Sequence, residues 1–282
     1  MLIDILKSIV YGIIEGITEW LPVSSTGHLI LLEKLLPFKN ISNYESFFEM
    51  YEVVIQLGAI AAVLVLFWHK LWPFATKKER AINPALFKTD TLNLWFKVIL
   101  AVIPSAFVGL LLDDWLDQHL YNALTVSVTL ILYGIFFILV EVWNKKRSPK
   151  VESFDTLSYP LAILVGAFQI LALIPGTSRS GATILGAIIL GLARPVAAEF
   201  SFFLAIPTML GASALKLVKY FLDGGRFNTA ELAVLLVGML VSFIVSLAAI
   251  KGLMAYVKKK DFSFFGYYRI ILGVIVLASL LI

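Results

Sequence analysis

Long apolar runs dominate the chain and predict α-helices that cross a membrane. Six runs approach or exceed the ~20 apolar residues that a helix needs to span the hydrocarbon core of a bilayer. They cover residues 50–69, 93–112, 122–143, 196–218, 229–252 and 265–282. The sequence therefore predicts a polytopic, all-α membrane protein.

Two other apolar stretches are each broken at a proline. The broken pairs are 2–21 with 28–36, which flank Pro22, and 159–174 with 182–193, which flank Pro175. Proline disfavours a helical conformation in the residue before it, so each pair predicts a helix, a polar break and a short return helix. Non-helical backbone is tolerated at membrane depth only where it is buried in protein or lines a wet cavity. We therefore expect two re-entrant hairpins.

The two halves of the chain repeat one plan, a hairpin followed by three spans. We expect a single integral membrane domain, residues 1–282, with a first repeat at about 1–145 and a second at about 155–282. An odd number of spans in each half gives the halves opposite orientations, so the repeats have inverted topology. Such repeats place a binding site near the middle of the membrane, where the broken helices meet.

Composition agrees with this class and excludes others. The chain is 60% hydrophobic and 15% charged, whereas a soluble domain is about 45–50% apolar and about 25% charged. Cysteine is absent, which excludes disulfides, thiolate catalysis and thiolate metal sites. The net charge of +4 is modest and the basic residues cluster at segment ends, so we expect no nucleic acid partner.

Charged loops predict the orientation of the chain. The loops after 50–69, 122–143 and 229–252 are rich in Lys and Arg, and such loops stay in the cytoplasm. The acidic loop at 113–117 then lies outside. The basic positions within 216–226 also fall outside, against the rule.

The first break follows two carboxylates inside an apolar segment. Glu15 and Glu19 are four residues apart, so they share one helix face. Ionisable groups within a membrane segment are costly and are functional candidates by default. The pair can bind a divalent cation through oxygen ligands or act as a general base. The alternative is that both carboxylates are solvated near a membrane surface.

Nucleophiles and a base follow directly. Ser24 or Ser25 can attack phosphorus if His28 takes the proton, and His28 can instead be the nucleophile. The other two histidines, His69 and His119, fall at segment ends or in loops. The competing structural role of the serines is to cap the short return helix.

The second break has the composition of an anion cradle. Arg179 offers a planar fork of donors that fits phosphate, and Gly176 and Gly181 let backbone N–H groups approach a ligand. A helix that begins near Gly181 points its positive end at the same place. The expected phosphate contacts are Arg179 and the hydroxyls of Thr177, Ser178, Ser180, Thr183 and Ser24. The structural alternative is an ion pair between Arg179 and Glu15 or Glu19.

These groups predict a membrane-embedded phosphatase for a lipid-linked phosphate or diphosphate. Catalysis of phosphoryl transfer is mainly positioning and charge neutralisation. The alternative is a transporter or flippase for an anionic lipid, which needs the anion clamp but no nucleophile. Glu52, Gln56 and Glu199 open the following spans, and we expect the two glutamates to be supporting or ion-pairing groups.

The motifs resemble those of the bacitracin-resistance family of undecaprenyl-diphosphate phosphatases. The similar stretches are Glu15-x-x-x-Glu19, 21–28 and 175–183, with further pieces at 51–58 and 199–202. The resemblance implies a bacterial inner-membrane hydrolase that converts undecaprenyl diphosphate to the monophosphate, which recycles the lipid carrier for peptidoglycan and envelope polymers and confers bacitracin resistance.

The resemblance also implies a divalent cation, Mg or Ca, as cofactor and a site that opens to the periplasmic side. The functional positions that it implies are Glu15, Glu19, Ser25, His28 and Arg179. As partners we expect the polyprenyl diphosphate substrate and membrane lipids. The sequence is compatible with a monomer or a homodimer, and it leaves open whether serine or histidine is the nucleophile.

Overall fold

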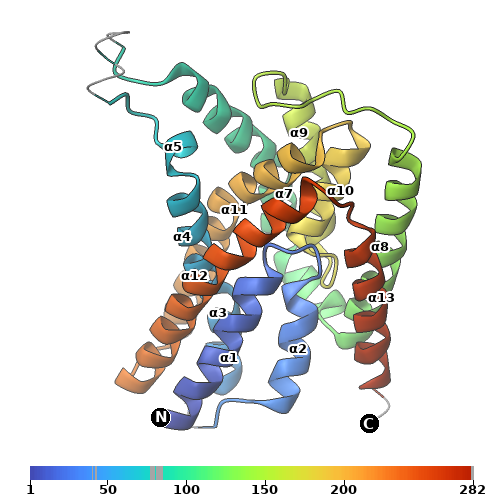
Figure 1. Cartoon of the computed structure of the whole chain (residues 1–282). Coiled ribbons are helices and arrows are strands. Elements are labelled where there is room, and N and C mark those ends of the chain that lie inside the picture. The colour runs from blue at the N-terminus through green and yellow to red at the C-terminus, as the bar shows by residue number, and fades with distance from the viewer. Residues whose placement is uncertain (40, 42, 77–79, 81–84, 281–282) are drawn as a thin grey trace.

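The computed structural model describes residues 1–282 except 40, 42, 77–79, 81–84 and 281–282, and the side chains of 113, 114 and 117 are also excluded from description. Part of the predicted orientation rests on residues outside this description. They are the basic positions 77 and 78 and the acidic side chains at 113, 114 and 117. The described elements are helical, which confirms the predicted all-α class (Figure 1).

The helices follow the predicted order closely. They are α1 (Leu2–Thr18), α2 (Ser25–Leu35), α3 (Tyr44–Val54), α4 (Gln56–Leu66), α5 (Trp68–Leu71), α7 (Thr89–Leu120), α8 (Ala123–Asn144), α9 (Tyr159–Phe168), the 3₁₀ turn η1 (Gln169–Leu173), α10 (Arg179–Ile189), α11 (Arg194–Leu222), α12 (Thr229–Val257) and α13 (Ser263–Ala278).

Five stretches of the described chain are long and apolar enough to cross a membrane. They are α3–α4 together, α7 to Leu112, α8, α11 and α12. The predicted sixth span, 265–282, corresponds to α13, which has only 16 residues. At 1.5 Å per residue α13 is about 24 Å long, shorter than the ~30 Å hydrocarbon core, so the prediction of a sixth full-length helix is not confirmed.

Both predicted breaks are present, and they have the same local design. We call residues 19–24 the first break and residues 174–178 the second break. Each ends at a serine with a left-handed backbone, Ser24 at φ 72° and Ser178 at φ 71°. Each serine caps a return helix of 11 residues, because its hydroxyl accepts a hydrogen bond from the backbone N–H of Gly27 or Gly181.

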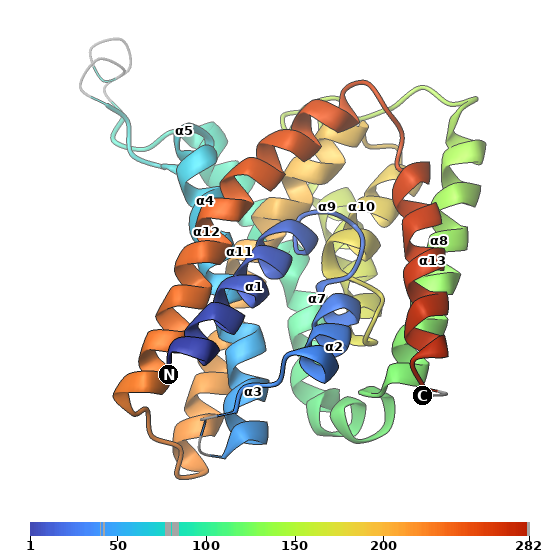
Figure 2. The same cartoon turned by 60° about the horizontal axis from the view of Figure 1, so that its bottom comes forward.

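The tips of the two hairpins meet at the centre of the helix bundle. Figures 1 and 2 show the α1–α2 hairpin entering from one end and the α9–α10 hairpin entering from the other. Their outer helices pack closely, α1 on α12 and α9 on α7. Glycine permits this approach: a Cβ at Gly166 of α9 would lie 1.8 Å from the carbonyl oxygen of Ala101 in α7.

The three loops that the sequence predicts to be cytoplasmic lie at one end of the molecule. In Figure 2 α5 and the chain after α8 and after α12 lie at the upper end, and both termini lie toward the lower end. The α7–α8 and α11–α12 connections also lie at the lower end. The basic loops after α4, α8 and α12 thus share one side of the molecule, whereas the basic positions within 216–226 lie toward the other side, as expected from the sequence against the rule.

Candidate functional site

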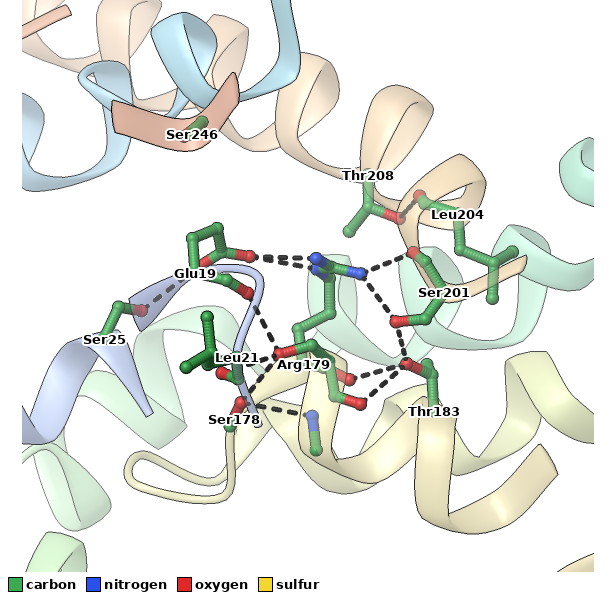
Figure 3. A network of polar contacts seen from close by, with 12 residues as sticks. Glu19, Leu21, Ser25, Ser178, Arg179, Thr183, Ser201, Leu204, Thr208 and Ser246 are labelled. Carbon is green, nitrogen blue, oxygen red and sulfur yellow. Dashed lines mark hydrogen bonds and ion pairs between the residues drawn. The ribbon is translucent and has the colours of Figure 1, made fainter. Parts of the chain in front are cut away.

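An ion pair joins the two hairpins at their tips. Glu19 caps the end of α1, and Arg179 is the first residue of α10. The Arg179 Nη2 and Nε atoms donate to Glu19 Oε1 at 2.9 and 3.3 Å (Figure 3). The two side chains are only 11% and 7% exposed. The pairing that the sequence left open is therefore made with Glu19.

The opposite edge of the Arg179 guanidinium is also fixed. Its Nη1 donates to the backbone carbonyl of Ser201 at 2.7 Å and lies 3.3 Å from the Ser201 hydroxyl. The indole of Trp20 lies 5.9 Å from the guanidinium carbon. Arg179 is thus held in one orientation, and one of the two Nη2 hydrogens remains for a ligand after the bond to Glu19 is made.

Ser25 is paired with the second oxygen of the same carboxylate. Its hydroxyl donates to Glu19 Oε2 at 3.2 Å (Figure 3). Ser25 is the first residue of α2 and Thr26 is the second. A hydroxyl whose proton faces a carboxylate is the arrangement of a nucleophile with its general base.

A cavity of about 420 Å³ lies against these groups. Its polar wall includes Ser25, Thr26, Glu19, Ser178 and Arg179. The N-termini of α2 and α10 therefore face one cavity, each with free backbone N–H groups and a positive helix dipole end. Two helix N-termini and an arginine at one cavity are a binding site for an anion.

Four of the predicted phosphate ligands lie outside the cavity lining. Ser24 is buried at its cap, and Ser180 donates to the backbone carbonyl of Glu19 at 3.0 Å. Thr183 contacts the Ser201 hydroxyl at 2.6 Å, and the Thr177 side chain is buried. The bond of Ser180 holds the two breaks against each other, and the contact of Thr183 holds Ser201 near Arg179.

His28 lies on α2 but does not line the cavity. Its Nδ1 is 2.7 Å from the backbone carbonyl of Ser24, so Nδ1 carries a proton and donates. Its Nε2 is 2.7 Å from the Tyr268 hydroxyl, and the two rings stack at 5.7 Å. His28 therefore connects α13 to the cap that precedes Ser25.

Glu15 is fully buried one helical turn before Glu19. Neither of its carboxylate oxygens has a hydrogen-bond partner within the described part of the chain. Buried carboxylates require compensation, and a divalent cation with oxygen ligands supplies it. No three His, Cys, Asp or Glu side chains cluster among the described residues, so hydroxyls, water or ligand phosphates must complete such a site.

Glu52, Gln56 and Glu199 lie near the beginnings of the predicted spans that follow the hairpins. The two glutamates make supporting contacts, and the glutamine belongs to the site. Glu199 pairs with Lys70 at 2.5 Å, and Glu52 accepts a hydrogen bond from Tyr121 at 2.7 Å. Both contacts agree with the supporting role expected from the sequence. Gln56, by contrast, lines the cavity.

Arg269 is a buried residue that the sequence reasoning missed. It is 0% exposed and donates from Nη1 to the carbonyl of Pro22 at 3.2 Å. Its Nη2 donates to the carbonyls of Gly176 and Thr177 at 2.8 and 2.9 Å. Arg269 therefore bonds both breaks at once. An arginine within a predicted span was the available signal.

A second missed group lines the far wall of the cavity. Gln169 donates to the hydroxyls of Ser105 and Thr208 at 2.6 and 3.1 Å. Those hydroxyls donate in turn to backbone carbonyls of their own helices, α7 and α11. This neutral network fixes η1 against both helices.

The fold and the site together define a multi-pass membrane protein with a cavity lined by an arginine and two helix N-termini and with a serine paired to a carboxylate. The chain belongs to the bacitracin resistance protein BacA family, whose model matches residues 8–275.

Curated relatives cover the chain almost completely. It is 56% identical over 277 residues to an undecaprenyl-diphosphatase of Limosilactobacillus fermentum, which covers 98% of both chains. It is 55% identical over 275 residues to an undecaprenyl-diphosphatase of Acetivibrio thermocellus, covering 98% of this chain and 97% of the relative. An undecaprenyl-diphosphatase of Enterococcus faecalis is 54% identical over 275 residues, at 98% and 96% coverage.

Proposed function

We propose that this protein hydrolyses undecaprenyl diphosphate to undecaprenyl phosphate and inorganic phosphate, which recycles the lipid carrier for envelope polymers. Membership of the family and relatives with that activity at 54–56% identity support the proposal. The single structural observation that carries it is the 3.2 Å bond from the Ser25 hydroxyl to Glu19 in a cavity lined by Arg179. A transporter needs the arginine but not that pair.

The geometry favours Ser25 as the nucleophile and Glu19 as its base. Glu19 Oε2 takes the hydroxyl proton while Oγ attacks the terminal phosphorus. The bond from that phosphorus to the bridging oxygen breaks, undecaprenyl phosphate leaves, and the proton passes from Glu19 to the leaving oxygen. Water then attacks the phosphoserine, Glu19 takes a proton from the water, and Oγ regains it as inorganic phosphate departs.

Arg179 and the two helix N-termini supply the positive charge that this reaction needs. The transferred phosphoryl group carries its charge on three equatorial oxygens, and fixed donors around them lower the barrier. Arg179 is already oriented by Glu19 and Ser201, so no reorganisation is required when the diphosphate binds.

In this proposal His28 positions the nucleophile rather than attacking phosphorus. Its ring is bonded to Ser24 and Tyr268 and lies outside the cavity lining. Because Ser24 precedes Ser25 in a left-handed conformation, the bond from His28 to the Ser24 carbonyl stabilises the turn that aims the Ser25 hydroxyl at Glu19.

We infer that Glu15 and Glu19 hold a divalent cation together with the substrate phosphates. Glu15 is buried outside the cavity lining, one helical turn before Glu19, and its two carboxylate oxygens have no partner in the described part of the chain. Magnesium is commonly bound by one or two carboxylates plus substrate phosphates. When bound, the cation neutralises charge on the diphosphate. Glu15→Gln should raise the metal concentration required for half-maximal activity by about tenfold or more. The surface control Glu45→Gln should not, and an unchanged metal titration for Glu15→Gln would remove the cation from this position.

We also propose that the chain consists of two inverted repeats with re-entrant hairpins and a periplasmic opening. The paired caps at Ser24 and Ser178 support the repeat. So does the reciprocal packing of α1 on α12 and α9 on α7, since each hairpin helix contacts the second full span of the other half. The placement of the basic loops at one end supports a cytoplasmic location for that end.

The test of the function is phosphate release from undecaprenyl diphosphate in detergent. Wild type should release phosphate, and Ser25→Ala should lose about a thousandfold or more in kcat, because it removes the nucleophile. His28→Ala should retain measurable turnover, at about a tenfold to hundredfold loss, because it disturbs only positioning. Ser279→Ala, a serine distant from the cavity, is the matched control.

The outcomes separate the alternatives. If His28→Ala is as inactive as Ser25→Ala and a phosphorylated enzyme is trapped in the serine variant, histidine is the nucleophile. If wild type releases no phosphate under any metal condition but moves lipid across a vesicle membrane, the phosphatase proposal is wrong and the transporter alternative stands.

A further inference from the structure

The cavity beside Ser25 continues into an apolar wall built by α7 and α11. Gly109 and Leu110 of α7 and Gly211, Ala212 and Leu215 of α11 belong to the same cavity lining as the polar groups. Gly109 follows Ser105 by one helical turn on the same helix face, and Gly211, Ala212 and Leu215 follow Thr208 by one or two turns on theirs. The polar and apolar parts therefore form one continuous surface.

Several positions of this wall are exposed, whereas the polar position Ser105 is buried. Ser105 is 4% exposed, whereas Leu110 is 71% exposed and Leu215 is 42% exposed. Both leucines line the cavity and lie within stretches that are apolar enough to cross a membrane. The cavity therefore opens sideways between α7 and α11, toward the lipid side of the bundle and not only toward water.

Both helices contain an interior proline before the apolar wall. Pro104 lies inside α7 and Pro207 inside α11, and a proline in a helix interior removes a backbone hydrogen bond and bends the helix. At Gly211 an added Cβ would meet nothing within 4 Å. A helical glycine beside open space leaves room along α11 that no side chain of the described chain fills.

We propose that the gap between α7 and α11 at Gly211, which we call the α7/α11 window, is the path by which the polyprenyl tail leaves the active site for the bilayer. This inference rests on the proposed function and adds the route of the tail to it. A cavity of about 420 Å³ encloses a diphosphate and the first isoprene units but not an undecaprenyl chain, so the remainder must pass through an opening into lipid. The α7/α11 window is apolar, lateral and continuous with the phosphate groups.

The proposed α7/α11 window affects substrates differently according to the length of their polyprenyl tail. A long tail must cross the window, whereas a short tail can be accommodated within the cavity. Filling the window should therefore discriminate against long chains and spare short ones. Gly211 is the position at which it can be filled with least disturbance, because an added side chain meets open space.

The test compares Gly211→Phe with Gly252→Phe. Gly252 lies in α12, also has nothing within 4 Å of an added Cβ, and does not line the cavity. For Gly211→Phe we expect kcat/KM to fall about tenfold or more for undecaprenyl diphosphate and to change less than about threefold for farnesyl diphosphate. Gly252→Phe should change neither. Loss on both substrates, or on neither, would overturn the tail route.

A second measurement does not depend on turnover. Because the chain contains no cysteine, Gly211→Cys in a Ser25→Ala background offers a single thiol at the α7/α11 window. Undecaprenyl diphosphate should slow its alkylation by a maleimide, inorganic pyrophosphate should not, and Gly252→Cys should be insensitive to both. Equal labelling of Gly211→Cys with and without the lipid would also overturn the route. Absence of phosphate release from either diphosphate by wild type would instead refute the proposed function.

Discussion

At the scale of single residues, a few side chains each make several of the contacts that hold the site together. Glu19 binds Arg179 with one oxygen and Ser25 with the other, so it links the anion clamp to the nucleophile. Arg269 binds the backbone of both breaks from α13. In a membrane interior a polar group is retained only if its hydrogen bonds are met, and both residues satisfy backbone or side-chain partners that would otherwise be unpaired.

Arg269 carries the sharpest prediction at this scale. Arg269→Lys keeps the positive charge but replaces a planar fork with a single nitrogen, which cannot reach the carbonyls of Pro22 and Gly176 in the same way. We expect a fall in kcat of about tenfold and a lower melting temperature in detergent. Arg226→Lys, on the exposed α11–α12 loop, is the control. Wild-type turnover and melting for Arg269→Lys would show that Arg269 does not hold the two breaks together.

At the scale of elements, each hairpin is held by the close approach of its outer helix to a long helix. In α1, an added Cβ at Gly12 would lie 2.6 Å from the carbonyl oxygen of Gly238 in α12. In α9, Gly166 is packed still closer on α7. Lipid tails are as apolar as the side chains, so helix association in a membrane relies on such packing and on hydrogen bonds.

A single methyl group should therefore loosen the second hairpin. Gly166→Ala places a Cβ against backbone of α7, which cannot move as a side chain can, and we expect a destabilisation of about 1–3 kcal/mol. Gly252→Ala, in open space, should be neutral or slightly stabilising. Thermal unfolding in detergent compares the two variants. Equal melting temperatures would mean that α9 and α7 are not packed as closely as the structure has them.

At the scale of the whole molecule, charge and packing act on different aspects of the structure. The charged loops predict which end faces the cytoplasm, whereas ion pairs between distant segments hold the halves together. At the upper end in Figure 1, the buried Glu141 of α8 binds Arg194 of α11 and accepts a hydrogen bond from the backbone N–H of Phe262, next to α13. At the centre Glu19 and Arg179 make the corresponding connection.

The orientation of the molecule is directly testable because the chain has no cysteine. Lys146→Cys and Lys259→Cys, in the basic loops, should react with a membrane-impermeant maleimide only after the membrane is opened. His119→Cys and Asp223→Cys, at the other end, should react in intact cells. Labelling in the reverse pattern would place the proposed periplasmic opening on the cytoplasmic side.

The sequence alone determined the class of the protein, the order of its helices, the two breaks and the stretches that bear chemistry. These features are local: apolar length, a proline, a capping serine and a run of hydroxyls act within a few residues of one another. Its expectation of a sixth full span at 265–282 is not confirmed, because the described helix α13 has 16 residues and a helix end depends on turns and packing that hydropathy does not report.

Only the tertiary structure decided which of these residues meet. The sequence places Glu15 and Glu19 on one helix face and does not distinguish their partners. In the structure Glu19 contacts Arg179, 160 positions away, whereas the oxygens of Glu15 have no partner in the described chain. His28 is as well placed as Ser25 in the motif, yet it faces Tyr268. The direction of a side chain is set by the helix against which it packs, and that partner comes from a distant part of the chain.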